Sequence, residues 1–357
     1  MSDPQRLQLL RSINEAADAE LLRSLRDHAN DRMASKRSEL PIDQFYTELN
    51  EAYDAMIRRA ISLAEAHMAR VGMGFPPVPY AYLLFGSGGR CEQTLSSDQD
   101  SGLVYEDEPD VEKAEANRNY FAKLSRQVVL VLERLGFPRC EGNVLSDNPA
   151  WSMSLSSWNK QLDEWFEHPA WESVRYLLIV ADGRCVYGDS LLLDRMQDHF
   201  FANMGKHPII IGRMLENTMR HKVLVGIFGQ LLKERYGEDT GSIDMKYGAY
   251  IPMVNAIRLM AIQQEIRNTS TLERMKALQK AGVLSDEDAR SYSEAFLLFL
   301  QLRLMTTEKQ EMGMYANNGK LAVRTLTRDT IEQLKRGLRI GKRLQRRVFK
   351  QASVRLR

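Results

Sequence analysis

Phe85-Gly86-Ser87-Gly88-Gly89-Arg90-Cys91-Glu92-Gln93-Thr94-Leu95-Ser96-Ser97-Asp98-Gln99-Asp100 is the stretch around which the rest of this chain is organised. An apolar run from Tyr80 to Phe85 leads into it and predicts a buried strand that ends in a glycine-rich turn. A second apolar run, Leu103-Val104-Tyr105, follows its two aspartates and predicts a second strand. The expected order is therefore strand, glycine turn, acid pair and strand.

The glycine turn and the acid pair together indicate chemistry on a phosphate. Glycines let the backbone approach a bulky anion, and N–H groups of a turn that enters a helix attract phosphate oxygens. Asp98 and Asp100 stand at i and i+2 of an extended segment, so their carboxylates point to the same side, about 6–7 Å apart. This spacing suits a pair of hard divalent cations bridged by the phosphates of a nucleotide. The stretch therefore has the layout of a metal-dependent nucleotidyltransferase.

The glycine turn alone is weak evidence, because glycine turns after strands are common structural features. It lacks the GxxxxGK[ST] pattern of a P-loop, and it is not the GxGxxG fingerprint of a dinucleotide-binding fold. The acid pair that follows it favours a catalytic role, since a solvated turn needs no such pair at the start of a strand.

Length and composition fit a globular protein with more than one domain. The chain has 357 residues, enough for two or three domains that each have their own core. No run approaches the roughly 18 apolar residues of a transmembrane helix, and the N-terminus lacks a signal region. Cys91, Cys140 and Cys185 are widely spread, with no CxxC pair. We therefore expect a cytoplasmic protein with free thiols and no membrane partner.

Residues 1–75 are expected to form an N-terminal helical region. Apolar residues repeat at steps of three and four on both sides of Pro41, which predicts a helical hairpin or a small bundle. A helix pair that binds a partner is the functional alternative to this core packing. Glycines and prolines between Gly72 and Pro79 indicate a linker and a domain boundary.

Residues 76–200 are expected to form a small nucleotidyltransferase domain with a mixed sheet. After the acid pair, a helix is predicted from Pro109 to Leu135, with Gly136 as its stop. The tryptophans of this region are assigned to packing, and the stacking of a base on one of them is the alternative.

A two-metal site usually needs a third carboxylate, which holds the second ion and helps to deprotonate the attacking group. We predict that Asp182 has this role, because the apolar run from Val174 to Val180 is expected to be a strand that ends beside it. Asp147 and Asp189 are weaker candidates. For Asp189, capping of a helix that begins at Ser190 is the simpler explanation.

Residues 201–357 show helical periodicity almost throughout and are expected to form an all-helical domain. The predicted helices are roughly 208–234, 246–267, 271–281, 285–311 and 328–350. The expected fold class is thus α+β, with a helical N-terminal region, a small mixed-sheet domain and a helical C-terminal domain.

The segment Gly86 to Asp100 closely resembles the nucleotidyltransferase domain of the protein-PII uridylyltransferase type. It is similar in particular to the stand-alone bacterial group that is often joined to cyclic-nucleotide-binding and CBS domains. That group has the pattern GS-x-GR-x-EQT-x-x-x-DQD, and every fixed position of the pattern is matched here. Asp182-Gly183-Arg184 with Gly188-Asp189 resembles the D-x-R…GD strand end of the family, although glycine follows the aspartate where the family has phenylalanine or leucine.

The resemblance extends over roughly residues 75 to 350. Ile243-Asp244-Met245-Lys246, with Arg258 further on, resembles a segment of the family's substrate-binding domain. Cyclic-nucleotide-binding, CBS, HD hydrolase and ACT modules have no counterpart in this sequence. Regulation through such modules, glutamine sensing and uridylyl removal are therefore not implied.

The resemblance also implies roles for individual residues. The catalytic and metal-binding residues that it implies are Asp98, Asp100 and Asp182, which would hold two Mg²⁺ ions together with a nucleoside triphosphate. The nucleotide-binding residues that it implies are Gly86, Ser87, Gly89, Arg90 and Lys246. Arg90 would offset the charge of the departing pyrophosphate, and an ion pair between Arg90 and Glu92 is the structural alternative. Lys246 and Arg258 would contact the nucleotide or the acceptor, and solvated helix positions are the alternative for both.

The C-terminal segment is strongly basic. Residues 320–357 carry about 13 Lys and Arg against Asp329 and Glu332. A basic helix of this kind can bind nucleic acid, an anionic membrane or an acidic partner. Packing of the helix onto the acidic remainder of the chain is favoured here over binding of nucleic acid.

The sequence therefore predicts a Mg²⁺-dependent nucleotidyltransferase of the uridylyltransferase type. It would transfer a nucleoside monophosphate from a nucleoside triphosphate to an acceptor, with a regulatory protein favoured, and release pyrophosphate. The main alternative is a non-catalytic nucleotide-binding module in signal transduction, and a third hypothesis is nucleotidylation of a small molecule. The base, the acceptor and the oligomeric state are not specified by these patterns.

Overall fold

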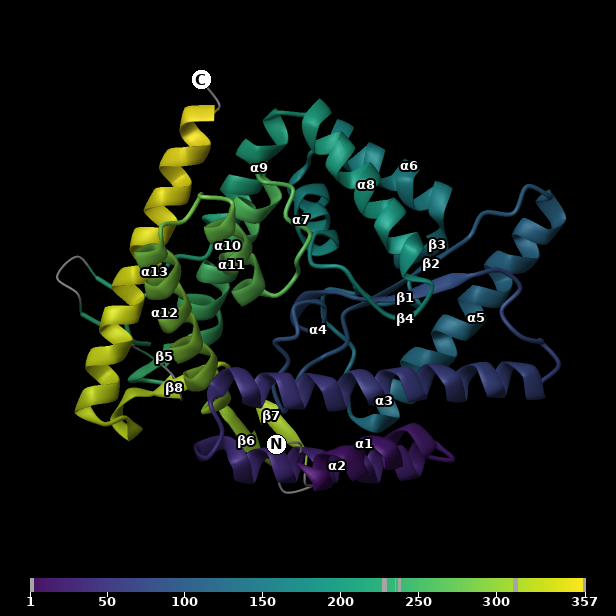
Figure 1. The fold of residues 1–357 in the computed structure, drawn as a ribbon, viewed down its shortest axis with the longest axis horizontal. Coiled ribbons are helices and arrows are strands. Elements are labelled where there is room, and N and C mark those ends of the chain that lie inside the picture. Colours follow the sequence, from purple (N-terminus) through teal and green to yellow (C-terminus); the bar gives the residue numbers. More distant parts are fainter. Residues whose placement is uncertain (1–2, 227–229, 235, 237–238, 311–313, 356–357) are drawn as a thin grey trace. The chain divides into compact units, whose positions relative to one another are not determined.

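A computed structural model describes residues 3–226, 230–234, 236, 239–310 and 314–355, and it has the predicted α+β fold (Figure 1). The chain divides into two compact units. The first contains residues 1–164, 182–202 and 312–314, and the second contains residues 165–181, 203–311 and 315–357. Residues 1–75 and the sheet that follows them thus share one unit.

The first unit is built from long helices and one small sheet. Its helices are α1 (Pro4–Glu15), α2 (Ala19–Ser35), η1 (Lys36–Ser38), α3 (Ile42–Arg70), α4 (Gly86–Gly89), α5 (Val111–Leu135) and η2 (Pro149–Trp151). Helices α6 (Leu155–Glu167) and α8 (Ser190–Lys206) begin in this unit and end in the second. The strands are β1 (Tyr80–Leu84), β2 (Ser101–Tyr105), β3 (Ser152–Ser154) and β4 (Arg184–Gly188).

The sheet is mixed, as predicted, and its strand order is β3-β2-β1-β4. Strand β1 is antiparallel to β2 and to β4, and β2 is parallel to β3. Leu84, the last residue of β1, lies opposite Ser101, the first residue of β2, and opposite Arg184 of β4. This register brings the glycine turn after β1 and the acid pair before β2 to the same end of the sheet.

Helix α5 begins and ends where its capping residues predict. The side chain of Asp110 accepts a hydrogen bond from the Lys113 amide at the start of α5, and Gly136 adopts the left-handed conformation at its end.

The Trp151 and Trp158 side chains are buried, and the Trp158 indole donates to the Leu103 carbonyl. The packing role predicted for these two tryptophans is therefore confirmed.

The strand expected at residues 174–180 is wrong, because this segment belongs to helix α7 (Trp171–Val180). A short apolar run fits a buried helix as well as a buried strand, and only its surroundings decide between them. The sheet strand near this point is β4, which begins after Asp182, so Asp182 does not end a strand. Strand β3 was not predicted, since its three residues carry no apolar pattern.

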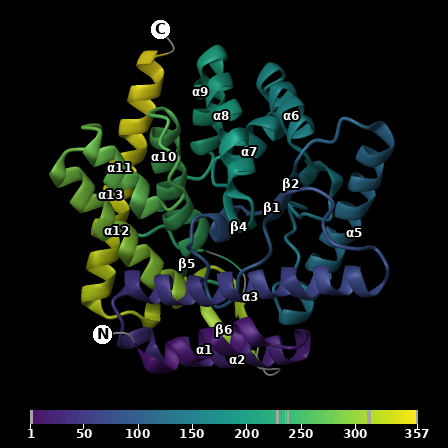
Figure 2. The ribbon, with the colours of Figure 1, turned by 45° about the vertical axis from the view of Figure 1, so that its right-hand side comes forward.

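The N-terminal helices form a bundle that belongs to the first unit. Helix α3 packs along α1 and α2, and α2 and α3 also pack against α5 (Figure 1 and Figure 2). Tyr53 of α3 is fully buried and donates a hydrogen bond to Asn30 of α2. The predicted small bundle is therefore confirmed, and its inner helix, α3, also packs against β4.

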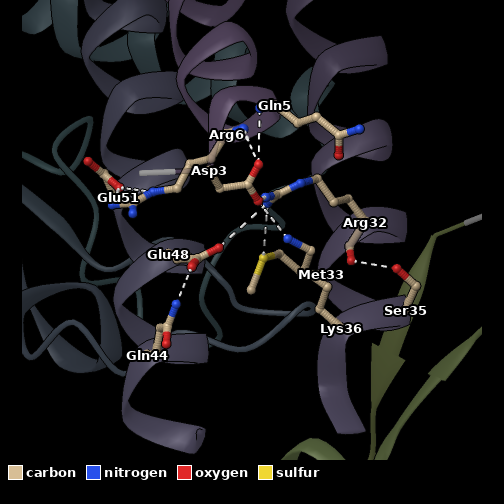
Figure 3. Close-up of polar contacts among 10 residues, drawn as sticks. All are labelled: Asp3, Gln5, Arg6, Arg32, Met33, Ser35, Lys36, Gln44, Glu48 and Glu51. Atoms are coloured by element: carbon tan, nitrogen blue, oxygen red, sulfur yellow. Dashed lines mark hydrogen bonds and ion pairs between the residues drawn. The ribbon is translucent and has the colours of Figure 1, made fainter. Parts of the chain in front are cut away.

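Asp3 ties α1 to α2 through a cluster of charges (Figure 3). Its carboxylate accepts hydrogen bonds from Lys36, at 2.6 Å, and from Arg32, and it also caps α1 by accepting from the Gln5 and Arg6 amides. The hydrogen bond from Lys36, together with the Arg32 charge, holds the pKa of Asp3 well below its usual range. The N-terminus is thus fixed by a carboxylate that must be ionised.

We expect Asp3→Asn to lower the thermal midpoint of unfolding at pH 6, and to lower it less at pH 3. Because folding lowers the pKa of Asp3, the carboxylate stabilises the folded state fully above its unfolded pKa; this contribution declines as the pH falls below the unfolded pKa and is lost as the pH falls through the lowered folded pKa. Asparagine keeps the helix cap, so the change in the thermal midpoint reports the loss of the charge. Asp43→Asn, at an exposed carboxylate in the first turn of α3, is the control. An effect of Asp3→Asn that is the same at both pH values would contradict this assignment.

The second unit is mainly helical. Besides α7, its elements are α9 (Ile209–Thr218), β5 (Ser242–Asp244), the π-helical η3 (Lys246–Tyr250), α10 (Ile251–Ile262), α11 (Thr271–Lys280), α12 (Asp286–Leu304), β6 (Thr307–Lys309), β7 (Tyr315–Asn317), β8 (Lys320–Ala322), η4 (Val323–Thr325) and α13 (Arg328–Arg355). Two antiparallel strand pairs, β5 with β8 and β6 with β7, correct the expectation of an all-helical domain. The helices predicted at 208–234 and 285–311 end early, at Thr218 and Leu304, and parts of the first range lie outside the described residues.

Helix α10 is the centre of this unit. Its residues are apolar or buried all around the helix, which is typical of a helix enclosed by others. Helices α9, α11 and α13 pack against it. On α13, an apolar face that includes Leu334, Leu338 and Val348 is buried, while Arg336 and Arg346 are exposed. The basic helix therefore packs through its apolar face and leaves arginines in solvent.

Candidate active site

The predicted phosphate turn and acid pair meet at one end of the sheet. The amide of Phe85, which follows β1, donates a 2.9 Å hydrogen bond to the carbonyl of Asp100, which precedes β2. The glycines after Phe85 form α4, a single helical turn. The structure therefore brings together two segments that the sequence had only placed in the same stretch.

Gly86 lies directly against the second aspartate. Its φ of +53° is in the left-handed region, and a Cβ built at this position would lie 2.1 Å from Oδ2 of Asp100. No side chain fits there unless the carboxylate moves. Glycine is therefore required at this position for two reasons: the left-handed conformation of the backbone and the lack of space for a Cβ. The backbone of the turn thus lies too close to the Asp100 carboxylate to leave room for a side chain.

Gly89 is required for a different reason. A Cβ at Gly89 would lie 2.0 Å from the carbonyl oxygen of Asp182 and 2.8 Å from that of Leu84. Both neighbours are backbone atoms, which cannot rotate away. Gly89 therefore fixes α4 against β1 and against the segment that leads into β4.

The start of α4 offers N–H groups for an anion. The first N–H groups of a helix have no partner within it, and the cap residue Phe85 supplies no side-chain acceptor. Ser87 is half-buried on this turn, and its carbonyl accepts a 2.8 Å hydrogen bond from the Glu92 amide, which closes the turn. Gly86 and Ser87 are thus placed where the sequence predicts a phosphate cradle.

The acid pair is held by the glutamine between its members. Gln99 is buried, and its Nε2 donates to the carbonyls of Phe137, at 2.8 Å, and Val129, at 3.3 Å. Asp98 is exposed and Asp100 is half-buried. The inward Gln99 side chain therefore anchors the loop and leaves the flanking carboxylates outside the core, as the alternation of an extended segment predicts.

Cys140 was predicted as a free thiol and belongs to a segment, Cys140-Glu141-Gly142-Asn143, that also resembles the family, but it was not predicted to lie near the acid pair. It lies on the irregular segment after α5, where its sulfur accepts a 3.3 Å hydrogen bond from the Val144 amide. Burial raises the pKa of the thiol to about 12, and the nearby charges of Asp100 and Asp98 and a hydrogen bond to Asp100 act in the same direction. Cys140 is thus a protonated thiol beside the acid pair, and no spacing rule in the sequence could have placed it there.

Arg90 and Asp182 form a buried ion pair behind α4. The Nη1 atom of Arg90 lies 2.7 Å from Oδ2 of Asp182, and its Nε atom lies 2.9 Å from Oε2 of Glu92. All three side chains are at most 5% exposed. The ion pair between Arg90 and Glu92, which was the structural alternative for Arg90, is therefore confirmed. The contact of Arg90 with a departing pyrophosphate stays a prediction.

The segment Asp182-Gly183-Arg184 fastens α4 from a second direction. Arg184 makes two hydrogen bonds to the Asp54 carboxylate, at 2.7 and 2.8 Å, and a third to the carbonyl of Gly88, at 2.9 Å. Together with the Arg90 pair, this contact joins α4 to α3 and to β4. The D-x-R motif of the sequence thus supports the glycine turn through both of its charged residues.

The predicted group of three metal-binding aspartates is not assembled among the described residues, where no three His, Cys, Asp or Glu side chains form a metal-binding group. Asp182 is completely buried and paired with Arg90, whereas Asp98 is exposed. Asp98 and Asp100 have the carboxylate oxygens that Mg²⁺ prefers, and Asp98 is exposed. The role of Asp182 as a ligand of a second ion stays a prediction, and such an ion would have to compete with Arg90.

The two weaker candidates have structural partners. The carboxylate of Asp189 accepts a 3.0 Å hydrogen bond from the Leu191 amide at the start of α8, so the predicted cap is confirmed. Asp147 accepts two hydrogen bonds from Arg139, at 2.8 and 3.0 Å. Both contacts give these aspartates a role in the fold.

Lys246 and Arg258 lie in the second unit. Lys246 is the first residue of η3, and its ammonium group lies 5.2 Å from the centre of the Tyr247 ring. Arg258 is buried on α10 and donates a 2.7 Å hydrogen bond to Asn255. Arg258 is therefore not the solvated helix residue that was the alternative, and the nucleotide-binding role of Lys246 stays a prediction.

Both parts of the chain match nucleotidyltransferase families. Residues 12–172 match the family described as "Putative nucleotidyltransferase DUF294", and residues 208–352 match the one described as "Putative nucleotidyltransferase substrate binding domain". A bifunctional glutamine synthetase adenylyltransferase/adenylyl-removing enzyme from Xanthomonas oryzae pv. oryzae (strain MAFF 311018) is 23% identical over 273 residues. The alignment covers 71% of the chain and 28% of that enzyme. Both comparisons support nucleotidyl transfer in general, and the first family match contains the glycine turn and the acid pair.

In the described part of the chain, no helix combines the length and the apolar character needed to cross a membrane. The predicted cytoplasmic location is not tested further by the fold.

Proposed function

We propose, on the basis of these family matches and the geometry of the site, that the protein transfers a nucleoside monophosphate from a nucleoside triphosphate to an acceptor and releases pyrophosphate. One observation carries the proposal: the left-handed Gly86 turn lies against the carboxylate of Asp100. A phosphate bound by the turn would therefore lie beside the acid pair. This is the arrangement that a metal–triphosphate complex requires.

In this proposal, α4 binds the triphosphate and the acid pair binds its metal. The free N–H groups at the start of α4 and the Ser87 hydroxyl would hold the β- and γ-phosphates. Asp98 and Asp100 would hold Mg²⁺. When bound, this ion would neutralise phosphate charge and polarise the α-phosphorus. Catalysis would come from positioning and electrostatics, without a covalent enzyme intermediate.

The reaction exchanges a phosphoanhydride bond for a phosphoester bond. The oxygen of an acceptor hydroxyl forms a bond to the α-phosphorus, and the bond from that phosphorus to the β-phosphate oxygen breaks, which releases pyrophosphate. Asp98 is the exposed member of the acid pair, so we propose that its carboxylate accepts the proton of the attacking hydroxyl. Asp182, which is buried, would act by positioning Arg90 and, through it, the glycine turn.

The finer assignment is to the protein-PII uridylyltransferase type, with a regulatory protein as acceptor. The pattern GS-x-GR-x-EQT-x-x-x-DQD between Gly86 and Asp100 supports it. The relative from Xanthomonas oryzae is named as an adenylyltransferase, so both UTP and ATP must be tested as donors. A non-catalytic module that binds a nucleotide for signalling is the second candidate, and the exposed Asp98 favours the enzyme.

A transfer assay tests this proposal directly. The purified chain is incubated with Mg²⁺ and each α-labelled nucleoside triphosphate, with and without proteins of a cell extract as acceptors. We expect labelled acceptor and pyrophosphate with at least one nucleotide, and a loss of about a hundredfold or more in Asp98→Asn, because the ion loses a charged ligand.

Asp189→Asn is the matched control, since it makes the same change at a helix cap that asparagine also supplies. It should retain full transfer activity. If no nucleotide gives transfer or pyrophosphate, or if Asp98→Asn equals the unmodified protein, the enzyme proposal is wrong. Nucleotide binding that persists without turnover would instead support the signalling module.

A further inference from the structure

The first unit contains a pocket that the proposed reaction does not use. It has a volume of about 500 Å³ and is lined by residues of β2, β3, α5 and the start of α6. Serine hydroxyl groups line the part of its wall formed by β3 and the start of α6, at Ser152, Ser154, Ser156 and Ser157. A volume of this size is typical of a small-molecule site rather than of a packing defect.

Asn117 of α5 provides the strongest sign of a ligand. Its side chain lines the pocket and is only 4% exposed, and its Nδ2 group has no hydrogen-bond partner among the described residues. A buried amide N–H group without a partner costs free energy, so such groups are rare in folded proteins. A ligand oxygen in the pocket would give Asn117 the acceptor that the protein does not supply.

The charges of the wall restrict what this ligand can be. Asp107, Glu108 and Asp147 line the pocket, and Arg118 is the cation among its described lining residues. Arg118 also pairs with Glu115 at the surface, at 3.0 Å. Asp147 is paired with Arg139, so Asp107 and Glu108 are the carboxylates that would repel a phosphorylated ligand most, and the pocket does not suit a triphosphate.

The hydroxyl groups of the wall already form a connected network. The Ser154 hydroxyl lies 3.2 Å from those of Ser156 and Ser157, and Asp107 accepts hydrogen bonds from the Ser156 amide and hydroxyl. Each of these hydroxyls can both donate and accept. Such a wall matches a ligand that has several hydroxyl groups of its own, because each hydroxyl of the wall and each hydroxyl of the ligand can donate one hydrogen bond and accept another.

We infer that this pocket binds an uncharged, unphosphorylated molecule rich in hydroxyl groups, and that Asn117 donates a hydrogen bond to it. Sugars and nucleosides share this chemistry. The Ser146 amide, on a residue that lines the pocket, donates a 3.1 Å hydrogen bond to the hydroxyl of Ser101, the residue after Asp100. The ligand would therefore bind next to β2, the strand that follows the acid pair. The inference does not rest on the proposed reaction.

The test measures binding to the full chain in the absence of any nucleoside triphosphate. One panel contains free sugars and polyols, the other contains nucleosides, and each compound is paired with its phosphate ester. Titration calorimetry and thermal midpoints report binding. We expect saturable binding within one of the two panels, and each phosphate ester of a bound compound should bind clearly more weakly than its parent.

Asn117→Leu separates a ligand contact from a structural role. It removes the unpartnered N–H group, so the thermal midpoint without ligand should stay unchanged or rise, whereas the affinity should fall about three- to tenfold for the loss of one hydrogen bond. Asn217→Leu is the matched control, because Asn217 of the second unit also has a buried Nδ2 group without a partner and does not line the pocket.

Three outcomes would overturn the inference. They are binding of no compound from either panel, equal binding of the phosphate esters, and unchanged affinity in Asn117→Leu. Asp98→Asn should keep the ligand affinity of the unmodified protein while it loses transfer. Failure of this inference and failure of the proposed reaction are therefore distinguishable.

Discussion

Arg90→Met is expected to destabilise the protein by about 3–5 kcal/mol, because it leaves the buried carboxylates of Asp182 and Glu92 without their shared cation. Asp182 is completely buried, so water cannot replace the guanidinium. The free energy of unfolding in urea at neutral pH measures this loss. Because the pair also supports α4, nucleotide transfer should fall in any fraction that remains folded.

A half-exposed ion pair provides the control for this experiment. Arg139→Met removes the partner of Asp147, and the Arg139 side chain is 40% exposed, so a loss of about 0–1 kcal/mol is expected. The triple substitution Arg90→Met, Glu92→Gln and Asp182→Asn removes the buried charges together and should recover part of the stability. A cost of Arg90→Met below that of Arg139→Met would contradict the assignment of a buried pair.

Gly89→Ala is expected to cost about 3 kcal/mol, at the upper end of the range for overpacked sites. The new Cβ would lie 2.0 Å from the Asp182 carbonyl oxygen and 2.8 Å from that of Leu84, and these backbone atoms can separate only if α4 moves. We therefore expect loss of transfer activity together with the loss of stability. Urea unfolding and the transfer assay measure the two effects on one preparation.

Gly205→Ala makes the same chemical change in helix α8, where a Cβ would have nothing within 4 Å. Alanine is the better helix former, so this control should stabilise the protein by about 0.5–1 kcal/mol. If both variants behave alike, the close approach at Gly89 does not constrain the turn.

The sequence predicted those parts of the site that depend on neighbouring residues. The strands on either side of Gly86–Asp100 follow from the apolar runs, and the placement of Asp98 and Asp100 outside the core, with Gln99 between them buried, agrees with the alternation of an extended segment. The limits of α5 follow from Asp110 and Gly136, whose capping chemistry is local. Where one or two residues determine the conformation, a single sequence was enough.

The remaining parts depend on contacts between distant segments, which no local pattern specifies. Residues 174–180 are apolar enough for a strand or a helix, and their surroundings in the fold make them a helix. That error placed Asp182 at the end of a strand. Its burial beside Arg90 is a contact between two residues that are 92 positions apart in the sequence. The position of Cys140 beside the acid pair likewise depends on how the segment after α5 returns to β2.

The contact between Gly86 and Asp100 also has an evolutionary consequence. Because the carboxylate fills the space of a Cβ at position 86, a lineage that keeps Asp100 cannot accept a larger residue at Gly86, whereas in a lineage that has lost the acid only the positive φ still favours glycine there. We expect the two positions to change together across relatives, and the acid to be lost before the glycine. Chains that carry a side chain at the first position would then be recognisable, from sequence alone, as descendants that have lost the acid and with it the proposed transfer.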